Sequence, residues 1–337
     1  MPRPYQSMKT KSKALELPRY YKLFSKGGLD LIQVTLPGTG GTQPLPSRAL
    51  ACMAVHTNGA SLLIDCGEGT QIRIRAAGLS YLKIEAIFIS HIHGDHIFGL
   101  FGLLSTMAML GRSGKLDIYA PRSFAPVLKF FLSYYGEGLN YPIEHHALEM
   151  KAPQLLFEDK LIRVSAFPLR HKIDCYGFIF REQQPQLNVK KMEIAARGLS
   201  LEEIATAKRG EDIIRGDRVI PNSELTYLPY EPRSYAYCSD TAPFPELSTW
   251  VKGVDLLYHE ATYTRDMEDK AAERFHSTAA QAALCAKEAG AGQLLLGHYS
   301  SKYRDLSVLL EEAKEIFPAT CLGKDLDVID IPLKKLL

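Results

Sequence analysis

Short apolar runs alternate with helical stretches along most of the chain after Leu29, and this alternation limits the folds that the chain can adopt. The apolar runs have the length and composition of strands. We expect strands over Leu31–Leu36, Ser61–Cys66, Ala86–Ser90, Leu116–Tyr119, Ile162–Pro168, Tyr235–Cys238, Val254–Tyr258 and Gln293–Leu296. Apolar periodicity predicts helices over Gly69–Ala77, Phe98–Leu110, Ala125–Tyr135, Thr278–Ala289 and Leu306–Ile316. Buried strands with helices between them indicate a layered α/β architecture.

The composition is that of an ordinary globular protein. With 337 residues, 46% of them hydrophobic and 23% charged, the chain is excluded from the disordered, collagen-like and coiled-coil classes. Its longest apolar stretch, Ile97–Gly111, is too short to cross a bilayer, so we expect no membrane partner. The N-terminal segment lacks the apolar region of a secretory signal, and six cysteines are scattered without paired spacing. We therefore expect reduced thiols and a cytoplasmic location.

Two segments differ from the rest of the chain. Residues 1–28 are interpreted as a basic N-terminal extension that precedes a domain over residues 29–337, since residues 1–27 carry seven Lys/Arg and one Glu. Such an extension attracts phosphate at long range, but a solvated tail is an equally good interpretation. Residues 182–233 interrupt two strong strand signals, so we interpret them as an inserted arm; they hold eight Lys/Arg against nine Asp/Glu.

A dense group of metal-ligand side chains follows one of the predicted strands. His91, His93, Asp95 and His96 lie within six residues. Imidazole and carboxylate are ligands that zinc prefers beside thiolate. Alternate residues of an extended segment point to the same side, so His91 and His93 can face one ion. Gly94 permits a sharp turn, after which Asp95 and His96 can face a second ion.

Three more candidate ligands each come just after an apolar run. They are His171, Asp240 and His298. Strand ends are where α/β sheets usually place their sites, so we expect these side chains to converge with the first group. Together the seven residues predict a site for two metal ions.

Several weaker features are interpreted as structural. Pro37 is expected to end the first strand early, and His56 is expected in a hairpin turn without a partner. His145 and His146 are expected on the surface, and the aromatic residues of 124–135 are expected in the core.

The His-x-His-x-Asp-His run resembles the signature of the metallo-β-lactamase superfamily. A wider set of motifs is similar to the ribonuclease Z family, the short-form tRNA 3′-end endonucleases. These motifs are Gly38–Pro44, Leu63–Gln71, Pro168–His171, Ser239–Thr241, His259–Thr262, His276–Thr278 and Gly297–Tyr303. The resemblance runs from about Leu31 to Ile331. It implies a four-layer αβ/βα sandwich, with residues 182–233 as an RNA-binding arm.

The resemblance also implies a role for each matching residue. Two Zn²⁺ ions, with Mn²⁺ or another divalent metal as an alternative, would be bound by His91, His93, His171, Asp95, His96 and His298, with Asp240 bridging them. Asp65 would orient the ligands from behind. The catalytic residues would be Asp95, His276 and Glu260. Ser300 and Lys302 would contact the substrate, although Lys302 replaces an arginine that is commonest in the family and loses its two-pronged grip on phosphate.

The chemistry of these residues agrees with such roles. Two close metal ions lower the pKa of a water, and the resulting metal hydroxide would attack the phosphodiester in line. Asp95 could accept the proton of that water, and His276 has an intrinsic pKa suited to protonating the leaving 3′-oxygen. Thr278 and Gln281 have the spacing of a capping box, so we expect free N–H groups at this helix start that could hold a phosphate.

The sequence therefore predicts an endoribonuclease that cleaves precursor tRNA 3′ of the discriminator base and leaves a 3′-hydroxyl. The resemblance implies a homodimer. The nearest alternative is a zinc phosphodiesterase acting on small or cyclic nucleotide diesters, and the 182–233 insertion favours the larger substrate. A catalytically silent RNA-binding scaffold would have lost a ligand, and a di-iron redox relative would carry a flavodoxin-like partner domain. The sequence shows neither feature.

Overall fold

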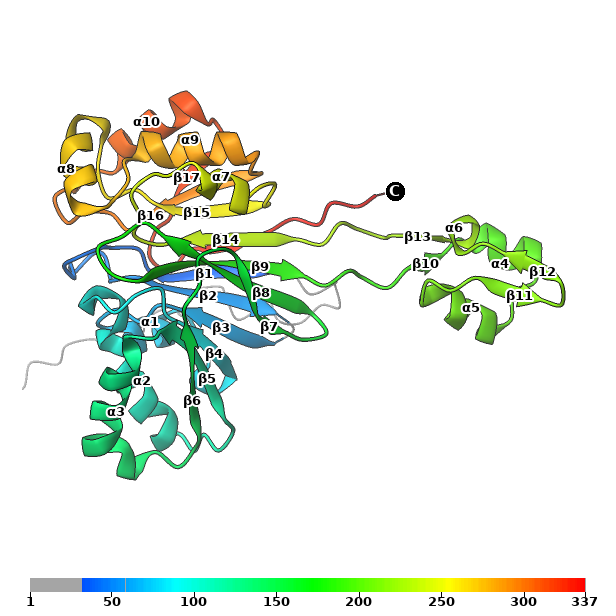
Figure 1. Cartoon of the computed structure of the whole chain (residues 1–337), viewed down its shortest axis with the longest axis horizontal. Helices are drawn as coiled ribbons and strands as arrows, with labels where there is room; N and C mark the ends of the chain where they lie inside the picture. The colour runs from blue at the N-terminus through cyan, green and yellow to red at the C-terminus, as the bar shows by residue number, and fades with distance from the viewer. Residues whose placement is uncertain (1–31, 58, 337) are drawn as a thin grey trace, which may run out of the picture. The chain divides into compact units, whose positions relative to one another are not determined.

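The computed structural model describes residues 32–57 and 59–336, so the predicted extension over residues 1–28 lies outside the described residues. Two seven-stranded sheets pack face to face, and their facing side chains form one apolar core (Figure 1). Helices pack on the outer face of each sheet through two further apolar clusters. The predicted four-layer αβ/βα sandwich is confirmed.

The first sheet has the strand order β18-β1-β2-β3-β4-β5-β6. Its strands are β1 (Gln33–Gly38), β2 (Cys52–Thr57), β3 (Ala60–Ile64), β4 (Ile84–Phe88), β5 (Leu116–Pro121), β6 (Ile143–Leu148) and β18 (Val328–Asp330). Its outer layer contains the helices α1 (Thr70–Ala76), α2 (Gly94–Met109) and α3 (Phe124–Tyr135). Two 3₁₀ turns, η2 (Tyr81–Lys83) and η3 (Gly136–Gly138), complete this half.

The second sheet has the strand order β17-β16-β15-β14-β9-β8-β7. Its strands are β7 (Gln154–Glu158), β8 (Ile162–Leu169), β9 (Cys175–Glu182), β14 (Ser234–Cys238), β15 (Leu256–Glu260), β16 (Gln293–Gly297) and β17 (Thr320–Leu322). Its outer layer contains α7 (Glu246–Trp250), α9 (Ala279–Ala289) and α10 (Ser307–Ile316). The turn η4 (Arg265–Met267) and α8 (Glu268–Arg274) precede α9.

Parallel strands in each sheet send their carboxyl ends toward one edge of the sandwich. β3 pairs in parallel with β4, and β4 with β5. In the other sheet, β14 pairs in parallel with β15, and β15 with β16. Loops that are distant in the sequence therefore meet at this edge, which is where the predicted ligands lie.

Each strand and helix expected from the sequence is present at nearly the expected position, but some local predictions were wrong. Pro37 does not end the first strand, because β1 continues to Gly38 through a shift of register after Thr35. His56 belongs to β2 itself and hydrogen-bonds on both sides, as described below. His145 and His146 are not surface residues of a polar loop.

Both of these histidines belong to β6 and are half-buried. His146 Nε2 lies 2.7 Å from Asp117 Oδ1, and its ring stacks on Tyr119. The aromatic residues of α3 are divided between two environments. Phe124 and Phe131 are buried as expected, whereas Phe130, Tyr134 and Tyr135 are more than half exposed.

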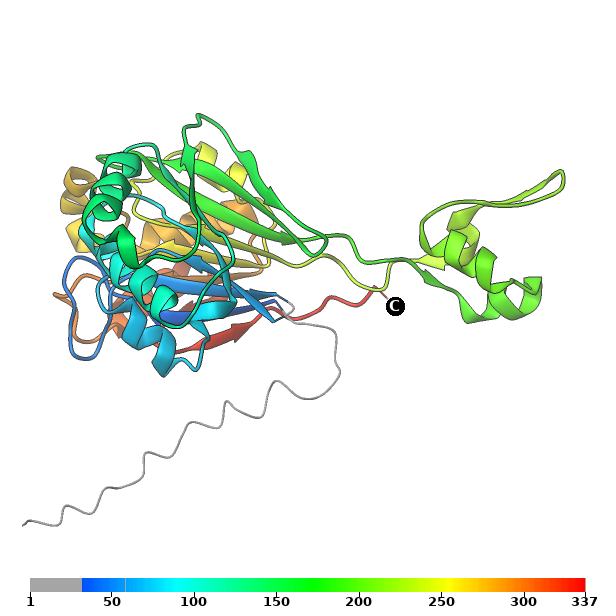
Figure 2. The same cartoon turned by 90° about the horizontal axis from the view of Figure 1, so that it is seen from below.

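The inserted residues 182–233 have a small apolar core of their own. Their elements are β10 (Asn188–Val189), α4 (Lys191–Arg197), α5 (Leu201–Lys208), β11 (Ile213–Arg215), β12 (Arg218–Ile220), α6 (Asn222–Leu225) and β13 (Thr226–Tyr227). Two chain segments, one leaving β9 and one returning to β14, connect these elements to the sandwich (Figure 1, Figure 2). At the base of the arm, the buried Arg233 guanidinium forms an ion pair with Glu182.

None of the helices in residues 32–57 and 59–336 combines the length and apolar character that a membrane span requires. All six cysteines are free thiols, as expected from their spacing.

Candidate metal centre

One group of candidate ligands is held by the turn between β4 and α2. β4 is buried and ends at Phe88, and the extended segment that follows carries His91 and His93. His93 precedes α2 directly, so Asp95 and His96 lie in the first turn of that helix. An acidic residue in a first turn is favoured by the partial positive charge of the helix start. The backbone N–H of Thr42 donates a 2.7 Å hydrogen bond to Asp95 Oδ2.

The other candidates come from loops of the second sheet. His171 follows β8, Asp240 follows β14 and His298 follows β16. His298 has a positive φ of 54°, which turns its side chain back toward the first sheet. Gly41 allows this, since a Cβ built on it would lie 2.4 Å from Cε1 of the His298 ring.

The structure brings all seven predicted ligands into two adjoining groups. In the first group, His91, His93, His171 and Asp240 each place one ligand atom within 4.8 Å of the others. In the second, Asp95, His96 and His298 do the same.

Asp240 lies between the two groups and turns one oxygen toward each. Its Oδ2 lies 3.5 Å from His91 Nε2 and 3.9 Å from His171 Nε2. Its Oδ1 lies 3.1 Å from His298 Nε2 and 3.6 Å from His96 Nε2. This is the arrangement expected of a carboxylate shared by two cations.

Unsatisfied hydrogen-bonding atoms among these side chains also indicate a metal site. His91 Nε2 and Asp240 Oδ1 are buried, and neither forms a well-aligned hydrogen bond among the described residues, although His298 Nε2 lies 3.1 Å from Asp240 Oδ1. Buried polar atoms without partners are costly, so their convergence needs an explanation. A cation at the meeting point of these lone pairs supplies one. His/Asp donor groups of this kind suit divalent metals.

Asp65 fixes the orientation of one candidate ligand, His96, on the side away from the centre. It is fully buried and has a positive φ of 55°. Its Oδ2 lies 2.9 Å from His96 Nδ1 and accepts a 2.8 Å hydrogen bond from the Tyr237 hydroxyl. The Ser90 backbone N–H donates to its Oδ1 at 2.8 Å. With Nδ1 of His96 held by a carboxylate, Nε2 is left to face the site.

The predicted pair His276 and Glu260 is in direct contact beside this centre. His276 Nδ1 lies 3.0 Å from Glu260 Oε1, and His276 Nε2 lies 4.0 Å from Asp240 Oδ2. Burial of the imidazole favours its neutral form, but the two carboxylates outweigh this effect and raise the pKa of His276 to about 9. Glu260 is itself held by the backbone N–H groups of Thr262 and Ser277.

One expectation about this region was wrong. The capping box of Thr278 and Gln281 is present, but the helix start it caps is not free to hold a phosphate. The Thr278 N–H donates to the Gln281 side chain, and the Ala279 N–H donates to the Tyr263 carbonyl. Ser277, Thr278 and Ala279 are also buried. The N-terminus of α9 therefore has a structural role.

A cavity of about 700 Å³ opens over the centre. Ser300 and Lys302, the predicted substrate contacts, are not among the residues that line it. Ser300 lies in the loop after β16, where its carbonyl accepts a hydrogen bond from Arg48, and the Lys302 ammonium lies near the sulfur of Met267.

The cavity is lined instead by several residues that the sequence analysis did not select. They are Phe98, Lys172, Tyr263, Lys270 and Arg274. Lys270 and Arg274 are four residues apart and lie between two of the motifs named above. This spacing could have predicted that both side chains lie on one face of a helix.

The two-sheet sandwich, with a His/Asp centre at its edge that suits divalent metals, is the metallo-β-lactamase fold. Two family models match parts of the chain: residues 32–152 match one described as Anti-Pycsar protein Apyc1, and residues 200–299 match one described as Beta-lactamase superfamily domain.

Whole-chain relatives specify the family further. Ribonuclease Z of Bacteroides thetaiotaomicron is 39% identical over 88% of this chain and 94% of its own length. Ribonuclease Z of Porphyromonas gingivalis strain W83 is 38% identical over 88% of this chain and 98% of its own length. The chain belongs to the ribonuclease Z family and is therefore a nuclease, a hydrolase of phosphodiesters.

A solved structure agrees with this assignment. The crystal structure of human tRNase Z, short form, aligns with a TM-score of 0.66 at 26% identity and covers 89% of this chain and all of that one. The predicted resemblance to this family is confirmed.

Proposed function

We propose that this chain is a cytoplasmic endoribonuclease that cleaves precursor tRNA 3′ of the discriminator nucleotide and leaves a 3′-hydroxyl on the tRNA. One observation carries the proposal: Asp240 turns one carboxylate oxygen toward each of two groups of His/Asp side chains, directly beside the His276–Glu260 pair. A phosphodiester held over this centre would meet both a nucleophile and a proton donor. The names of the relatives, which include tRNase Z, support tRNA as the substrate.

We propose that two Zn²⁺ ions occupy the centre, one held by His91, His93 and His171, the other by Asp95, His96 and His298, with Asp240 bridging them. When bound, such ions supply a nucleophilic water of lowered pKa and positive charge that stabilises the transition state. Manganese or another divalent metal is also compatible with imidazole and carboxylate donors.

The side chains around the centre then have separate tasks. His276 donates a proton to the leaving 3′-oxygen, because it lies beside the centre, is paired with Glu260 and is not one of the seven ligands. Glu260 holds the imidazole in position through Nδ1, which leaves Nε2 to face the substrate. Asp95 accepts the proton of the attacking water, and Asp65 keeps His96 correctly turned.

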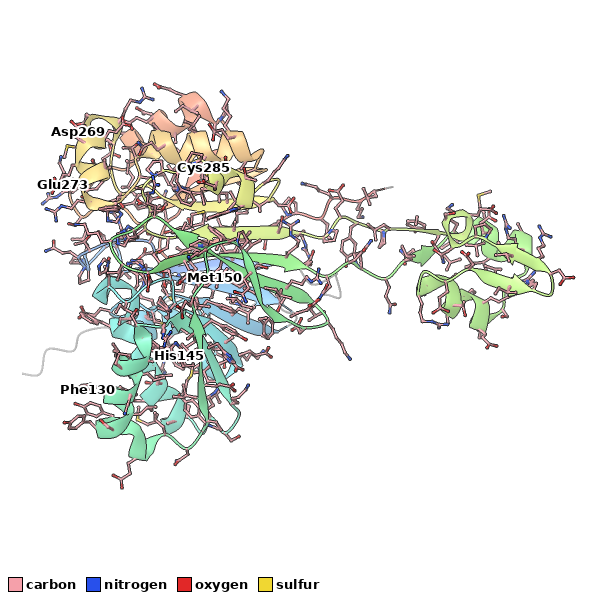
Figure 3. The ribbon with its side chains drawn as sticks, viewed as in Figure 1. Phe130, His145, Met150, Asp269, Glu273 and Cys285 are labelled. Carbon is pink, nitrogen blue, oxygen red and sulfur yellow. The ribbon has the colours of Figure 1, made fainter. Side chains whose placement is uncertain are left out.

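Two further proposals concern parts of the molecule outside the centre. We assign residues 182–233 as an RNA-binding arm, since a small diester would need no such insertion. We also propose that the chain forms a homodimer through α3 and the end of α2. Phe130, Tyr134, Tyr135 and Met109 are each more than 60% exposed there, and Figure 3 shows Phe130 directed away from the body. An apolar patch of this kind marks an interaction surface.

The test is to incubate the purified protein with a 3′-extended precursor tRNA and to map the new end. We expect a single cut 3′ of the discriminator nucleotide, a 3′-hydroxyl product, loss of cleavage with a chelator and recovery with zinc. If the zinc-loaded protein leaves this RNA uncut but hydrolyses cyclic nucleotides, the small-diester alternative is correct instead.

A further inference from the structure

Phe98 is an exposed aromatic side chain at the mouth of the catalytic cavity. It projects from the first turns of α2, and 64% of its surface is exposed. Its ring packs against Gly94, where an added Cβ would fall 2.4 Å from Cε2. Because the Phe98 ring is exposed, a role in packing the apolar core does not explain it. An exposed ring beside a phosphodiester site is suited to stacking on a nucleic-acid base.

A second aromatic side chain lines the cavity from the other sheet. Tyr263 lies between β15 and α8, with its ring centroid 6.1 Å from that of His276. The ammonium of Lys270 lies 6.0 Å from the Tyr263 ring. Within residues 32–57 and 59–336, no carboxylate forms an ion pair with Lys270 or Lys172. This wall thus combines a ring with positive charge that is available to a phosphate.

The cleavage chemistry distinguishes the Phe98 side of the cavity from the side formed by Tyr263 and Lys270. Cleavage breaks the bond between phosphorus and the 3′-oxygen of the upstream nucleotide, and that oxygen takes its proton from His276. The oxygen of the attacking water stays on the 5′-phosphate of the downstream nucleotide. The upstream nucleotide must therefore lie beside His276, which is the side of Tyr263. The downstream nucleotide keeps the phosphorus, and it extends from that atom on the side away from His276.

We propose that the RNA strand crosses the cavity with one polarity: the upstream nucleotide lies against Tyr263 and Lys270, and the first downstream base stacks on Phe98. This inference rests on the proposed function, because it uses His276 as the donor to the leaving oxygen. It assigns Phe98 to the trailer nucleotide that is removed, and Tyr263 to the discriminator nucleotide that is kept.

The experiment combines protein variants with abasic substrates. Wild type, Phe98→Ala and Phe98→Tyr, all loaded with zinc, are given a precursor tRNA with either a normal or an abasic first trailer nucleotide. Stacking of one base predicts that the abasic site lowers kcat/KM of the wild type roughly 10-fold. Phe98→Ala should be slower on the normal RNA by a similar factor and lose nothing more on the abasic RNA. Phe98→Tyr should behave as wild type.

A binding measurement gives a second readout that does not need turnover. With a chelator present, 2-aminopurine at the first trailer position should be quenched by the wild type and by Phe98→Tyr, but not by Phe98→Ala. The proposal would be overturned if the losses in kcat/KM caused by Phe98→Ala and by the abasic trailer nucleotide multiplied when combined. It would also be overturned if the loss caused by Phe98→Ala disappeared on an RNA with an abasic discriminator nucleotide. Cleavage of the normal RNA by the wild type tests the proposed function separately, and if it does not occur, the inference fails with that function.

Discussion

Asp240 is the residue on which both halves of the candidate centre depend. Burial alone would favour its protonated form, but His298 and His96 outweigh burial and hold the pKa of this carboxyl well below its ordinary range. Its charge is therefore retained although the side chain is buried. An amide of the same shape would keep one oxygen but lose the charge and the second donor oxygen.

Asp240→Asn is accordingly expected to release metal and activity together. Loss of a partner behind a ligand already costs about 10–100-fold in affinity or activity, so loss of a shared ligand should cost at least 100-fold. Metal content by elemental analysis and cleavage of precursor tRNA would be measured side by side. Asp330→Asn, an exposed carboxylate on β18, is the matched control. Full metal content in Asp240→Asn would contradict the bridging role.

His276→Ala separates proton donation from metal binding. A ribose 3′-oxygen needs a proton as it leaves, whereas p-nitrophenolate does not. We therefore expect kcat for precursor tRNA to fall about 10²–10⁴-fold, with a much smaller loss on a p-nitrophenyl phosphodiester. Glu260→Gln should show the same selectivity to a lesser degree. Equal losses on both substrates would assign His276 to the metal centre.

The sequence predicted which candidate donors would converge, because donor chemistry depends on residue type and the candidates follow strand ends. It did not predict Phe98, Tyr263 or Lys270, since nothing in a helical apolar pattern says which ring stays exposed at a cavity. It also predicted free N–H groups at the start of α9, although tertiary contacts occupy that turn. Residue type was sufficient to identify the candidate metal donors, but it did not identify the residues that line the cavity.

At the scale of elements, β2 contains a titratable side chain inside the sheet. His56 Nε2 lies 2.9 Å from Thr35 Oγ1, and its Nδ1 lies 2.9 Å from Ser61 Oγ. Burial lowers the pKa of His56 from 6.5 to about 4. The sequence predicted the turn after β2. It did not predict that His56 lies within the strand, because that position depends on partners in β1 and β3, which no local pattern specifies.

His56 should make the folded state sensitive to mild acid. The unfolded chain binds a proton at this residue below pH 6.5 and the folded chain only below about pH 4, so stability is lost as the pH falls. Between pH 7 and pH 5 this contribution amounts to about 2 kcal/mol. Urea unfolding of the wild type and of His56→Gln at both pH values measures it, because other groups cancel in the comparison. An identical pH dependence in both proteins would show that His56 titrates normally.

At the scale of the whole molecule, the layers were predictable and the surfaces were not. Apolar runs predicted the buried strands and a layered α/β architecture, whereas the four-layer sandwich was implied by the family resemblance. In the arm, counting charges was not informative. The numbers of basic and acidic residues are nearly equal, and several of these residues form ion pairs with each other. Arg197 pairs with Glu193 and Glu224, and Arg215 pairs with Glu203.

The arm also exposes apolar side chains. Leu201 is 87% exposed, and Ile214 and Val219, which face each other across the β11–β12 hairpin, are 72% and 55% exposed. RNA contact through this arm would therefore include apolar surface and would not rely on net charge alone.

Replacing residues 184–230 by a short Gly-Ser linker should separate substrate size from chemistry. The Glu182–Arg233 pair at the base is kept, so the sandwich should fold with an unchanged melting temperature. We expect kcat/KM for precursor tRNA to fall about 100-fold, equivalent to roughly 2.7 kcal/mol of lost interaction. Hydrolysis of a p-nitrophenyl phosphodiester should be retained. If both activities fell equally, the arm would be part of the catalytic fold and not a contact for RNA.

The exposed face of α3 gives the last prediction, on assembly. Phe130 and Tyr134 lie one helical turn apart with their ring centroids 5.0 Å from each other, so together they present a continuous apolar surface. A charged residue at the centre of such a surface opposes self-association, because the charge would be buried without a partner. Tyr134→Glu should therefore convert a dimer, measured by light scattering during size exclusion, into a monomer. Leu155→Glu introduces the same charge at an exposed apolar position on β7 and should leave the dimer intact. A dimer that survives Tyr134→Glu but not Leu155→Glu would move the interface to the edge of the second sheet.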